Sequence, residues 1–273
     1  MVTGVAADLV AYGGASPSLP GVVARPVLHP VHTTGGTLVT AAEPADHPWH
    51  RGIGVGLPDV SGVNLWGGPS YRPGAGYAAE HTVHGVVRTA GAEIAADRIE
   101  DRLHWCGPDG TVLLAEQRRI DRQVIDGILV LDWRSKLVAA RPVSLGSPAS
   151  HGRPGAGYGG FFWRLPVVAP DAVSVWTARA EGETATNGAV APWLAIALRT
   201  PEPWTAVLRP LDARTAADPW FVRITEYAGV GSGLAAAEPL PLAAGAGLTI
   251  GLRLVLSDGS PPVADLLAVG EQR

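Results

Sequence analysis

The sequence predicts an all-β protein built as a large antiparallel β-sandwich, on three observations. Its 273 residues include 35 glycines and 24 prolines, roughly a fifth of the chain, and both residue types disfavour helices. Segments in which apolar and polar residues alternate recur from end to end, which is typical of strands with one buried face. Hydrophobic residues make up 47% of the chain, enough to fill a core between two sheets.

The predicted strands of the first half are bounded by glycine, proline and aspartate turns. They are expected at residues 22–28, 37–40, 53–57, 83–94, 111–120 and 128–138. Asp126 and Gly127 lie between the last two strands, and this dipeptide favours a tight β-hairpin.

The second half continues the pattern and ends in the only predicted helix. Strands are expected at residues 160–165, 173–178, 193–198, 205–208, 220–227 and 248–256. In the last of them every second residue from Leu248 to Leu256 is leucine or isoleucine, a clear period of two. Residues 262–269 begin with proline and have the pattern of a short C-terminal helix. No linker divides the chain, so residues 1–273 are expected to form a single domain.

The overall charge and the cysteine content limit the partners and the compartment. The formal net charge is −4 and the basic residues are scattered, whereas a nucleic-acid-binding surface needs a concentrated basic face. Cys106 is the only cysteine, which excludes an internal disulfide and fits a reducing cytoplasm. The first residues lack the features of a signal peptide, and no stretch approaches the ~20 apolar residues of a membrane-spanning helix. We therefore expect a soluble, cytoplasmic protein without nucleic-acid or membrane partners.

The hexapeptide Arg-Pro-Gly-Ala-Gly-Tyr occurs twice, at residues 72–77 and 153–158. One interpretation is that two glycine- and proline-rich turns have converged in a biased composition. The other is that two loops at the rim of a site each offer an arginine and a tyrosine to a ligand. Neither copy is a phosphate-binding loop, because that motif needs a lysine and the only lysine, Lys136, lies elsewhere.

Histidine spacing is the strongest indication of a site. Six of the eight histidines form three His-x-x-His pairs: His29 and His32, His47 and His50, His81 and His84. Two imidazoles three residues apart share one side in a turn but point to opposite faces in a strand. The first two pairs contain proline and lie among turn residues, so each pair is expected to converge. The third lies at the start of a strand, so at most one of its members is expected to face the same cavity.

Three interpretations of these histidines are open. One or two of them could act as acid and base in a metal-free site, because the pKa of histidine lies near neutrality. A transition metal could instead bind the imidazoles of His29, His32, His47 and His50, with a carboxylate such as Asp46 or Glu80 completing the site. The third interpretation is that most of the histidines are structural.

Paired carboxylates for glycoside hydrolysis are a further alternative. Solvated or ion-paired carboxylates are the default expectation at alternating strand positions. The candidates are Glu80, Glu116, Asp132 and Glu226.

Three segments carry a resemblance to a known family: Arg25 to Val31, Asp46 to Gly52, and Asp59 to Trp66. They resemble a bacterial family labelled methane oxygenase PmoA, or simply domain of unknown function. The labelled activity belongs to a membrane copper enzyme, and this chain has no segment able to span a bilayer, so that activity is not carried over. The resemblance implies instead an all-β protein associated with sugar oxidoreductases and carbohydrate catabolism.

The same resemblance implies a relation to the galactose-mutarotase-like supersandwich of aldose epimerases, where a histidine acid and a glutamate base act on the sugar ring. The residues that match the family pattern are His47, His50, Arg51, Asn64 and His84. His32 stands where an aromatic residue is expected, and the insert around residues 72–77 is unusual. These departures leave a specialised substrate open.

We therefore predict an enzyme that acts on a sugar or another oxygen-rich small molecule by proton transfer, as an epimerase, isomerase or lyase. His50 is the predicted acid or base, with His47 or His84 as its partner. The remaining predicted contacts to the substrate are polar donors and aromatic rings: His29, His32, Arg51, Asn64, Arg164, Trp49, Trp66, Trp163, Tyr77 and Tyr158. The expected consequence is that His50→Ala abolishes turnover while thermal stability barely changes.

This prediction requires no cofactor, with the transition metal as its alternative. The alternative to an enzyme is a non-catalytic carbohydrate-binding β-sandwich. Exposed sheet edges make a homodimer reasonable.

Overall fold

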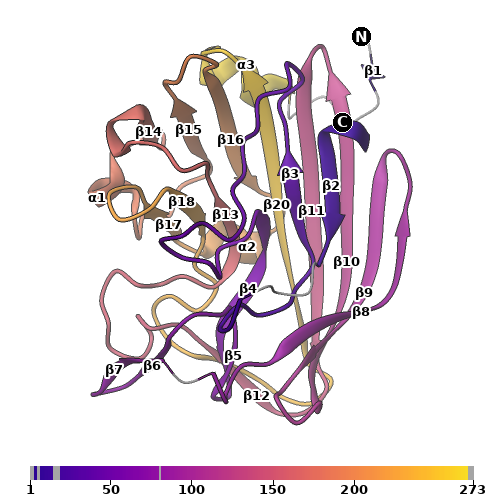
Figure 1. Cartoon of the computed structure of the whole chain (residues 1–273), viewed down its shortest axis with the longest axis vertical. Coiled ribbons are helices and arrows are strands. Elements are labelled where there is room, and N and C mark those ends of the chain that lie inside the picture. Colours follow the sequence, from indigo (N-terminus) through magenta and orange to yellow (C-terminus); the bar gives the residue numbers. More distant parts are fainter. Residues whose placement is uncertain (1–2, 5–6, 15–18, 80, 270–273) are drawn as a thin grey trace.

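The computed structural model describes residues 3–4, 7–14, 19–79 and 81–269, and it has the predicted all-β architecture (Figure 1). In this part of the chain two nine-stranded antiparallel sheets, here named the long sheet and the site sheet, are accompanied by one two-stranded hairpin. One core cluster joins the two sheets and includes Leu28 and Val55 of the site sheet and Leu103 and Leu131 of the long sheet. Each sheet buries one face against the other, which explains the period of two in the sequence.

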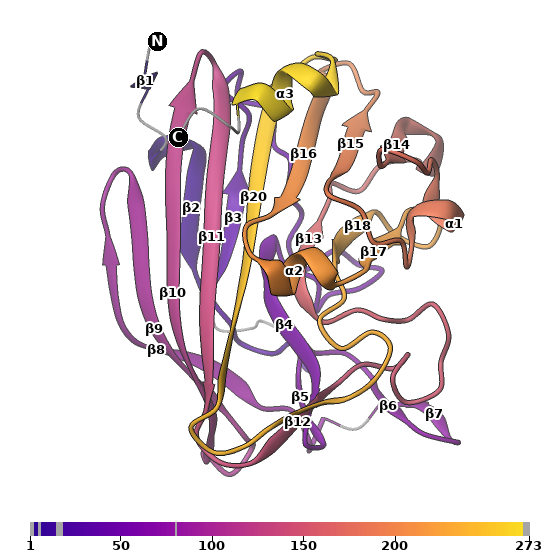
Figure 2. The same ribbon diagram turned by 180° about the vertical axis from the view of Figure 1, so that it is seen from behind.

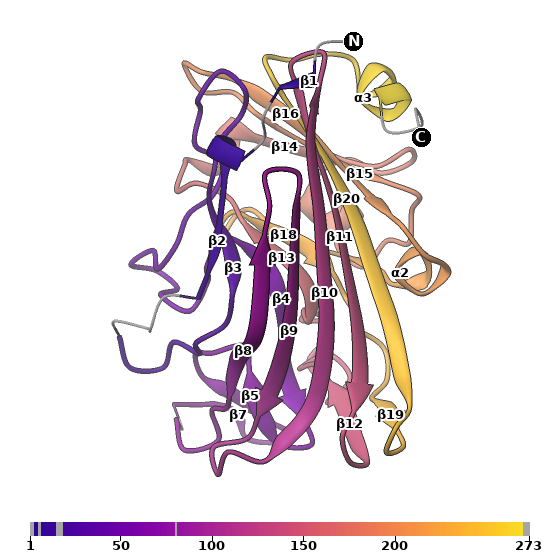
Figure 3. The same ribbon diagram turned by 90° about the vertical axis from the view of Figure 1, so that its right-hand side faces the viewer.

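The long sheet contains the longest strands of the molecule (Figure 3). Its strand order is β14-β15-β16-β20-β11-β10-β9-β8, and β1 pairs with β10. The bounds of its strands are β1 (Thr3–Gly4), β8 (Val86–Ile94), β9 (Arg98–Cys106), β10 (Val112–Ile125), β11 (Ile128–Ala139), β14 (Val173–Trp176), β15 (Leu194–Leu198), β16 (Trp204–Pro210) and β20 (Gly247–Asp258).

The site sheet is built from shorter strands. Its order is β17-β18-β13-β4-β12-β19, with β3 and β5 also paired to β4 and β2 paired to β3. The bounds are β2 (Val10–Gly13), β3 (Val27–Val31), β4 (Ile53–Val60), β5 (Val63–Leu65), β12 (Val143–Gly146), β13 (Gly160–Arg164), β17 (Trp220–Arg223), β18 (Gly229–Ser232) and β19 (Leu240–Leu242). The separate hairpin consists of β6 (Ser70–Arg72) and β7 (Gly76–Ala78).

The hairpin of β10 and β11 forms as predicted. Asp126 and Gly127 both have positive φ, 49° and 79°, which is the conformation of a type I′ turn. Ile125 and Ile128 face each other directly across it. On the other side of β11, β20 pairs in register from Leu256 to Gly247, so the strand with the clearest alternation lies in the middle of the long sheet.

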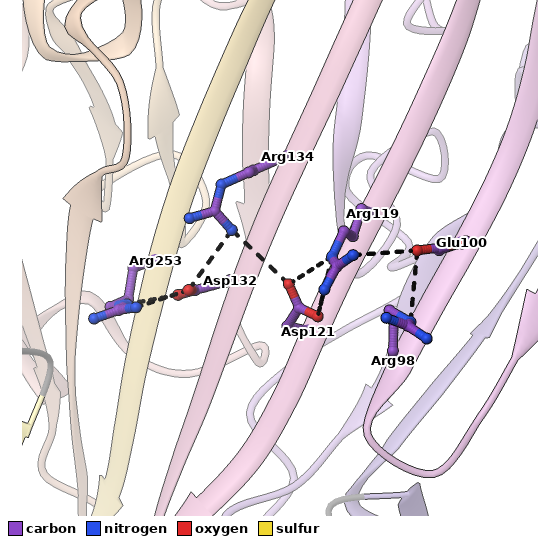
Figure 4. Close-up of polar contacts among 7 residues, drawn as sticks. All are labelled: Arg98, Glu100, Arg119, Asp121, Asp132, Arg134 and Arg253. Atoms are coloured by element: carbon purple, nitrogen blue, oxygen red, sulfur yellow. Dashed lines mark hydrogen bonds and ion pairs between the residues drawn. The ribbon is translucent and has the colours of Figure 1, made fainter. Parts of the chain in front are cut away.

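A row of alternating charges crosses the outer face of the long sheet (Figure 4). Asp121 and Asp132 face each other in register on β10 and β11, and like charges in such a pair repel. Arg134 lies between them, with Nη1 3.9 Å from Asp121 and 3.7 Å from Asp132. Arg253 binds Asp132 through two nitrogens at 2.5 and 2.7 Å, and Arg119 binds Asp121. The arginines therefore offset the repulsion between Asp121 and Asp132, which would otherwise destabilise the pairing of β10 with β11.

Helices are short, and the longest covers part of the outer face of the long sheet (Figure 2). This is the predicted C-terminal helix, α3 (Val263–Val269), which buries Leu266 in a cluster with Val130, Val207 and Val255. The other helical segments, which the sequence did not predict, are η1 (Ala7–Leu9), η2 (Pro170–Ala172), α1 (Glu183–Thr186) and α2 (Ala213–Ala217). Within the described ranges no helix is both long and apolar enough to cross a membrane.

Two predicted strands are wrong. The strand expected at residues 22–28 begins only at Val27, and the residues before Val27 have no strand structure. Residues 37–40 make only an isolated bridge, between Leu38 and His32. Two backbone hydrogen bonds flank this bridge, from Val39 to Val31 O and from Thr33 to Thr37 O, both at 2.9 Å. The backbone amide of Val31 donates to the Thr40 hydroxyl at 3.1 Å, so a side chain takes the place of the next backbone acceptor and the pairing does not extend.

Candidate functional site

A cavity of about 270 Å³ lies against the site sheet, beside an aromatic cluster that is separate from the core between the two sheets. It is lined by the loops before β4, β6 and β13, by β7, and by β17 with the turn that follows it. The lining combines imidazoles, phenols, indoles, two guanidinium groups and one carboxylate: His47, Trp49, His50, Trp66, Gly67, Pro69, Tyr77, Arg153, Ala156, Tyr158, Phe221, Arg223, Glu226 and Tyr227. The volume is just below the range of drug-sized ligand sites, which suits one small ring.

Two consecutive turns bring His47 and His50 together. The amide of His47 donates to Pro44 O at 3.1 Å and that of His50 to His47 O at 2.9 Å, so the two side chains leave the loop on the same side. Their rings stack, with centroids 4.8 Å apart and an interplanar angle of 10°. The expected convergence of this pair is observed.

His50 is buried against aromatic rings. It is only 2% exposed, and its centroid lies 4.8 Å from that of Phe162 and 4.6 Å from that of Tyr227. Its Nδ1 is buried without a hydrogen-bond partner among the described residues, which leaves Nε2 as the ring nitrogen available to the cavity. Burial lowers the pKa of His50 well below 6.5, and His47, Arg164 and Arg25 lower it further. His50 is therefore neutral at pH 7.

Asp46 sets the orientation of His47. Its Oδ2 lies 3.3 Å from Nδ1 of His47, and an ionised carboxylate can only accept, so Nδ1 carries a proton and Nε2 is the acceptor of the neutral ring. The same carboxylate receives both hydrogen bonds of Arg164 Nη2, at 2.9 and 2.7 Å. Although desolvation opposes it, Arg164 holds the pKa of Asp46 below its usual value, with help from His47. The chain Arg164–Asp46–His47 thus produces an imidazole suited to accept a proton.

Aromatic side chains form the floor of the cavity. Trp66, Phe162 and Phe221 make a separate buried cluster with Trp49 packed against it. The ring of Trp49 lies against Gly68, where φ is +68° and a Cβ atom would come within 2.4 Å of the indole. Glycine is therefore required at position 68, beneath Trp49.

The two hexapeptide copies fold alike and meet at the cavity. In each the fourth-residue amide bonds the first-residue carbonyl, Ala75 to Arg72 at 3.1 Å and Ala156 to Arg153 at 3.3 Å. The third residues, Gly74 and Gly155, have φ of 74° and 76°. Proline followed by a glycine of positive φ is the pattern of a type II turn.

The tyrosines that end the two copies, Tyr77 and Tyr158, have hydroxyls 3.2 Å apart. Arg153 donates to the Tyr77 hydroxyl, and its guanidinium carbon lies 4.7 Å from the centre of that ring. Burial raises the pKa of Tyr158 well above 10, so its phenol stays protonated. Both interpretations of the repeat hold in part, because the copies are similar turns and they also meet at the rim.

Asn64 and His84 lie behind the cavity and support its wall. Asn64 Oδ1 accepts the amides of Trp66 and Gly67 at 2.9 and 2.8 Å. His84 Nε2 lies 2.9 Å from Gly68 O, and its ring contacts that of His81 at 5.0 Å. Neither Asn64 nor His84 lines the cavity, so the roles expected for them in contacting substrate do not follow from their positions.

Five further predicted residues do not line the cavity. His29 is in β3, not in a turn, and its Nδ1 is 2.9 Å from Thr40 Oγ1. His29 and His32 are therefore set as in a strand, and the convergence expected for this pair is wrong. Arg51 Nε lies 3.5 Å from Glu43. Trp163 stacks on Trp204 in the core at 5.4 Å. Arg164 binds Asp46, as described above, and affects His47 through that carboxylate.

The geometry gives little support to glycoside hydrolysis by paired carboxylates or to a metal site. Glu116 is enclosed between the sheets, where Arg118, Trp105 and Ser135 all donate to it, and Asp132 belongs to the charge row on the outer face. Glu226 does line the cavity, whereas Glu80 lies outside the described residues. Within the described ranges no three His, Cys, Asp or Glu side chains are grouped as a metal would require, and the set of His29, His32, His47 and His50 is not brought together.

Sequence reasoning missed the wall formed by β17 and the turn after it. Phe221, Arg223 and Tyr227 come from this segment, which lies more than 170 residues beyond His50 in the chain. The run Trp220-Phe221-Val222-Arg223 was the available signal, because it concentrates aromatic residues beside an arginine. Arg153 lines the cavity, as one interpretation of the repeated hexapeptide expected, whereas Arg72 of the first copy does not.

Comparisons with known proteins give remote structural matches. A polysaccharide lyase has 11% identity and a TM-score of 0.41, over 95% of this chain and 34% of that one. The heparan sulfate lyase HepC from Pedobacter heparinus has 11% identity and a TM-score of 0.32, over 67% and 24%. A galactose mutarotase related enzyme from Lactobacillus acidophilus has 11% identity and a TM-score of 0.36, over 91% and 98%. This chain thus spans about a third or less of either lyase.

No curated protein sequence matches the chain. A family model supports the resemblance of the sequence to a family without an established function. That model is described as a family of unknown function, DUF6807, and it matches residues 8–269, so the chain belongs to this family.

Proposed function

We propose that this protein is an enzyme that binds a sugar or a related oxygen-rich ring and transfers a proton through the pair of His47 and His50. The observation that carries the proposal is the stacked pair itself. His50 is neutral and keeps a buried Nδ1 without a partner, and an unsatisfied buried polar group costs stability. Such a cost is typical of a group retained for function.

The arrangement supplies the parts of acid–base catalysis. His47, with its proton held on Nδ1 by Asp46, presents an acceptor nitrogen. One of the phenols of Tyr77 and Tyr158 donates to the other, and the remaining hydroxyl hydrogen can be donated to a substrate oxygen and stabilise a developing negative charge. The indole of Trp49 offers a flat face to a sugar ring, and Trp66, which is only 3% exposed, supports the floor of the cavity. These roles support an epimerase, isomerase or lyase.

Proton transfer can be followed without knowing the product. Each member of a panel of aldoses, ketoses and sugar acids is incubated with the protein in D₂O and observed by proton NMR. We expect at least one sugar to lose a C–H signal next to its carbonyl or to interconvert its anomers faster than the buffer control. The variant His50→Phe, which keeps a ring in place, should abolish this change.

Binding without either change would contradict the enzymatic proposal and support a carbohydrate-binding β-sandwich. Intrinsic fluorescence measures that binding directly, because Trp49 and Trp66 line the cavity. A change that persists in His50→Phe would remove His50 from the mechanism.

A further inference from the structure

The charges around the cavity are not balanced. Two guanidinium groups line it, from Arg153 and Arg223, against the one carboxylate of Glu226. Arg25 lies directly behind the floor, with its guanidinium carbon 5.6 Å from the centre of the Trp66 ring. Arg25 donates to the carbonyls of Trp66 and Trp49 and, among the described residues, has no carboxylate partner. Arg223 Nη1 also lies 4.0 Å from Glu183 Oε1, so the excess positive charge near the cavity comes chiefly from Arg153 and Arg25.

Arg153 has an unused hydrogen-bonding edge. Its Nη1 donates to the hydroxyl of Tyr77, and the ring of Tyr77 holds the guanidinium plane in place. Within the described part of the chain, Nε and Nη2 of Arg153 make no hydrogen bond. These two groups form the edge that binds a carboxylate through two parallel hydrogen bonds.

Arg223 holds the loop that carries Arg153. Its Nη2 donates to Gly155 O at 2.6 Å, and its Nη1 donates to Val222 O at 3.0 Å. The guanidinium also lies over the ring of Phe221, 5.1 Å from its centre. The free edge of Arg153 is thus fixed from two sides, by Tyr77 and by the anchored turn, and little side-chain entropy is lost when an anion binds.

We propose that the natural ligand is a sugar acid and that the Nε–Nη2 edge of Arg153 binds its carboxylate at the rim of the cavity. The inference rests on the proposed function, because it names the substrate class of the same site. The sugar ring then lies over Trp49, within reach of the two histidines. Arg153 determines specificity and takes no part in proton transfer.

Two matched pairs of ligands test this assignment: D-glucuronate against D-glucose, and D-galacturonate against D-galactose. Affinities are measured by tryptophan fluorescence and by calorimetry at low ionic strength and in 0.5 M NaCl. We expect at least one sugar acid to bind roughly tenfold or more tightly than its neutral counterpart, with the advantage shrinking at high salt.

Arg153→Gln should remove that advantage and leave the affinity for the neutral sugar unchanged, since the Arg153 side chain is exposed and the fold does not depend on it. Tyr77→Phe should reduce the advantage in part, because the guanidinium loses its hydroxyl partner. The control is Arg98→Gln, which removes the same charge from the outer face of the long sheet and should change nothing.

Equal affinity within both pairs, binding of neither member, or equal weakening of both members by Arg153→Gln would overturn the inference. Proton transfer on neutral sugars without a preference for acids would overturn this inference alone. A clear preference for a sugar acid without proton transfer would leave it standing and reject the proposed reaction.

Discussion

The imidazole rings of His47 and His50 stack at a centroid distance of 4.8 Å. Two stacked imidazoles cannot both take up a proton without mutual repulsion, and burial already favours the neutral form of His50. The protein thus places one neutral, enclosed ring beside a second, more accessible ring whose tautomer is set by Asp46. This relationship leads to the predictions that follow.

The first prediction separates the effect of changing His50 on stability from its effect on proton transfer. The sequence suggested that His50→Ala leaves stability almost unchanged, but the ring is 2% exposed and packed among aromatic side chains. His50→Ala should therefore lower the free energy of unfolding by about 2 kcal/mol or more. His50→Phe fills the same space and removes an unsatisfied polar atom, so its melting temperature should equal or exceed that of the wild type.

Both variants should lose proton transfer in the NMR assay, and thermal unfolding followed by circular dichroism gives the stability. A clear loss of stability in His50→Phe would mean that the imidazole makes a stabilising hydrogen bond in solution.

The second prediction concerns acid. The pKa values of His29, His50 and His84 all lie below 6.5 in the folded protein, chiefly because of burial. Between those values and 6.5 the unfolded chain binds protons that the folded chain does not. These three histidines therefore lower the free energy of unfolding as the pH is lowered from 7 to 5, whereas Asp218, whose pKa burial raises to about 7, offsets part of that fall. Melting temperatures at pH 7, 6 and 5 measure this fall.

The fall should be smaller in His50→Phe than in the wild type, because one of the three groups is absent. Identical slopes in the two proteins would show that the pKa of His50 is close to its ordinary value.

The third prediction tests the chain from Arg164 through Asp46 to His47. Asp46→Asn leaves Arg164 buried without its anion and replaces the carboxylate that orients His47 by an amide that can both donate and accept. We expect a loss of about 1–3 kcal/mol in unfolding free energy, less than for a fully buried pair because Asp46 is 36% exposed. The rate of proton transfer should drop roughly tenfold to a hundredfold.

Nitrogen NMR of the His47 ring distinguishes orientation from simple destabilisation. In the wild type the proton should reside on Nδ1, and in Asp46→Asn both tautomers should be populated. An unchanged tautomer would remove Asp46 from the mechanism.

The fourth prediction assigns Glu116 to the core. The Glu116 and Arg118 side chains are 0% exposed and bonded at 2.7 Å, so Glu116→Gln leaves a buried guanidinium without its counter-charge. This should cost about 3–5 kcal/mol of stability. The matched control is Glu100→Gln on the exposed charge row, where the side chain is 45% exposed and the cost should stay below about 1 kcal/mol.

Ligand affinity should be unchanged in folded Glu116→Gln, as measured by fluorescence titration at 10 °C. A selective loss of affinity would return Glu116 to the list of functional carboxylates.

The sequence by itself determined the fold class and several of its parts. Alternation of apolar residues from Leu248 to Leu256 predicted the central strand β20, and Asp126-Gly127 predicted the turn of the β10–β11 hairpin. These succeeded because strand periodicity and turn conformation depend on neighbouring residues. The pair of His47 and His50 was predictable for the same reason, since two local turns bring the rings together.

Only the tertiary structure decided which of the remaining residues share the cavity. Tyr77 and Tyr158 are 81 residues apart and meet through their hydroxyls, and no local pattern encodes that distance. Trp163 looked suitable for a sugar ring, yet it packs in the core because β13 turns it toward Trp204. A strand fixes which face its side chains take, but the packing of the two sheets decides whether that face meets the core or a ligand.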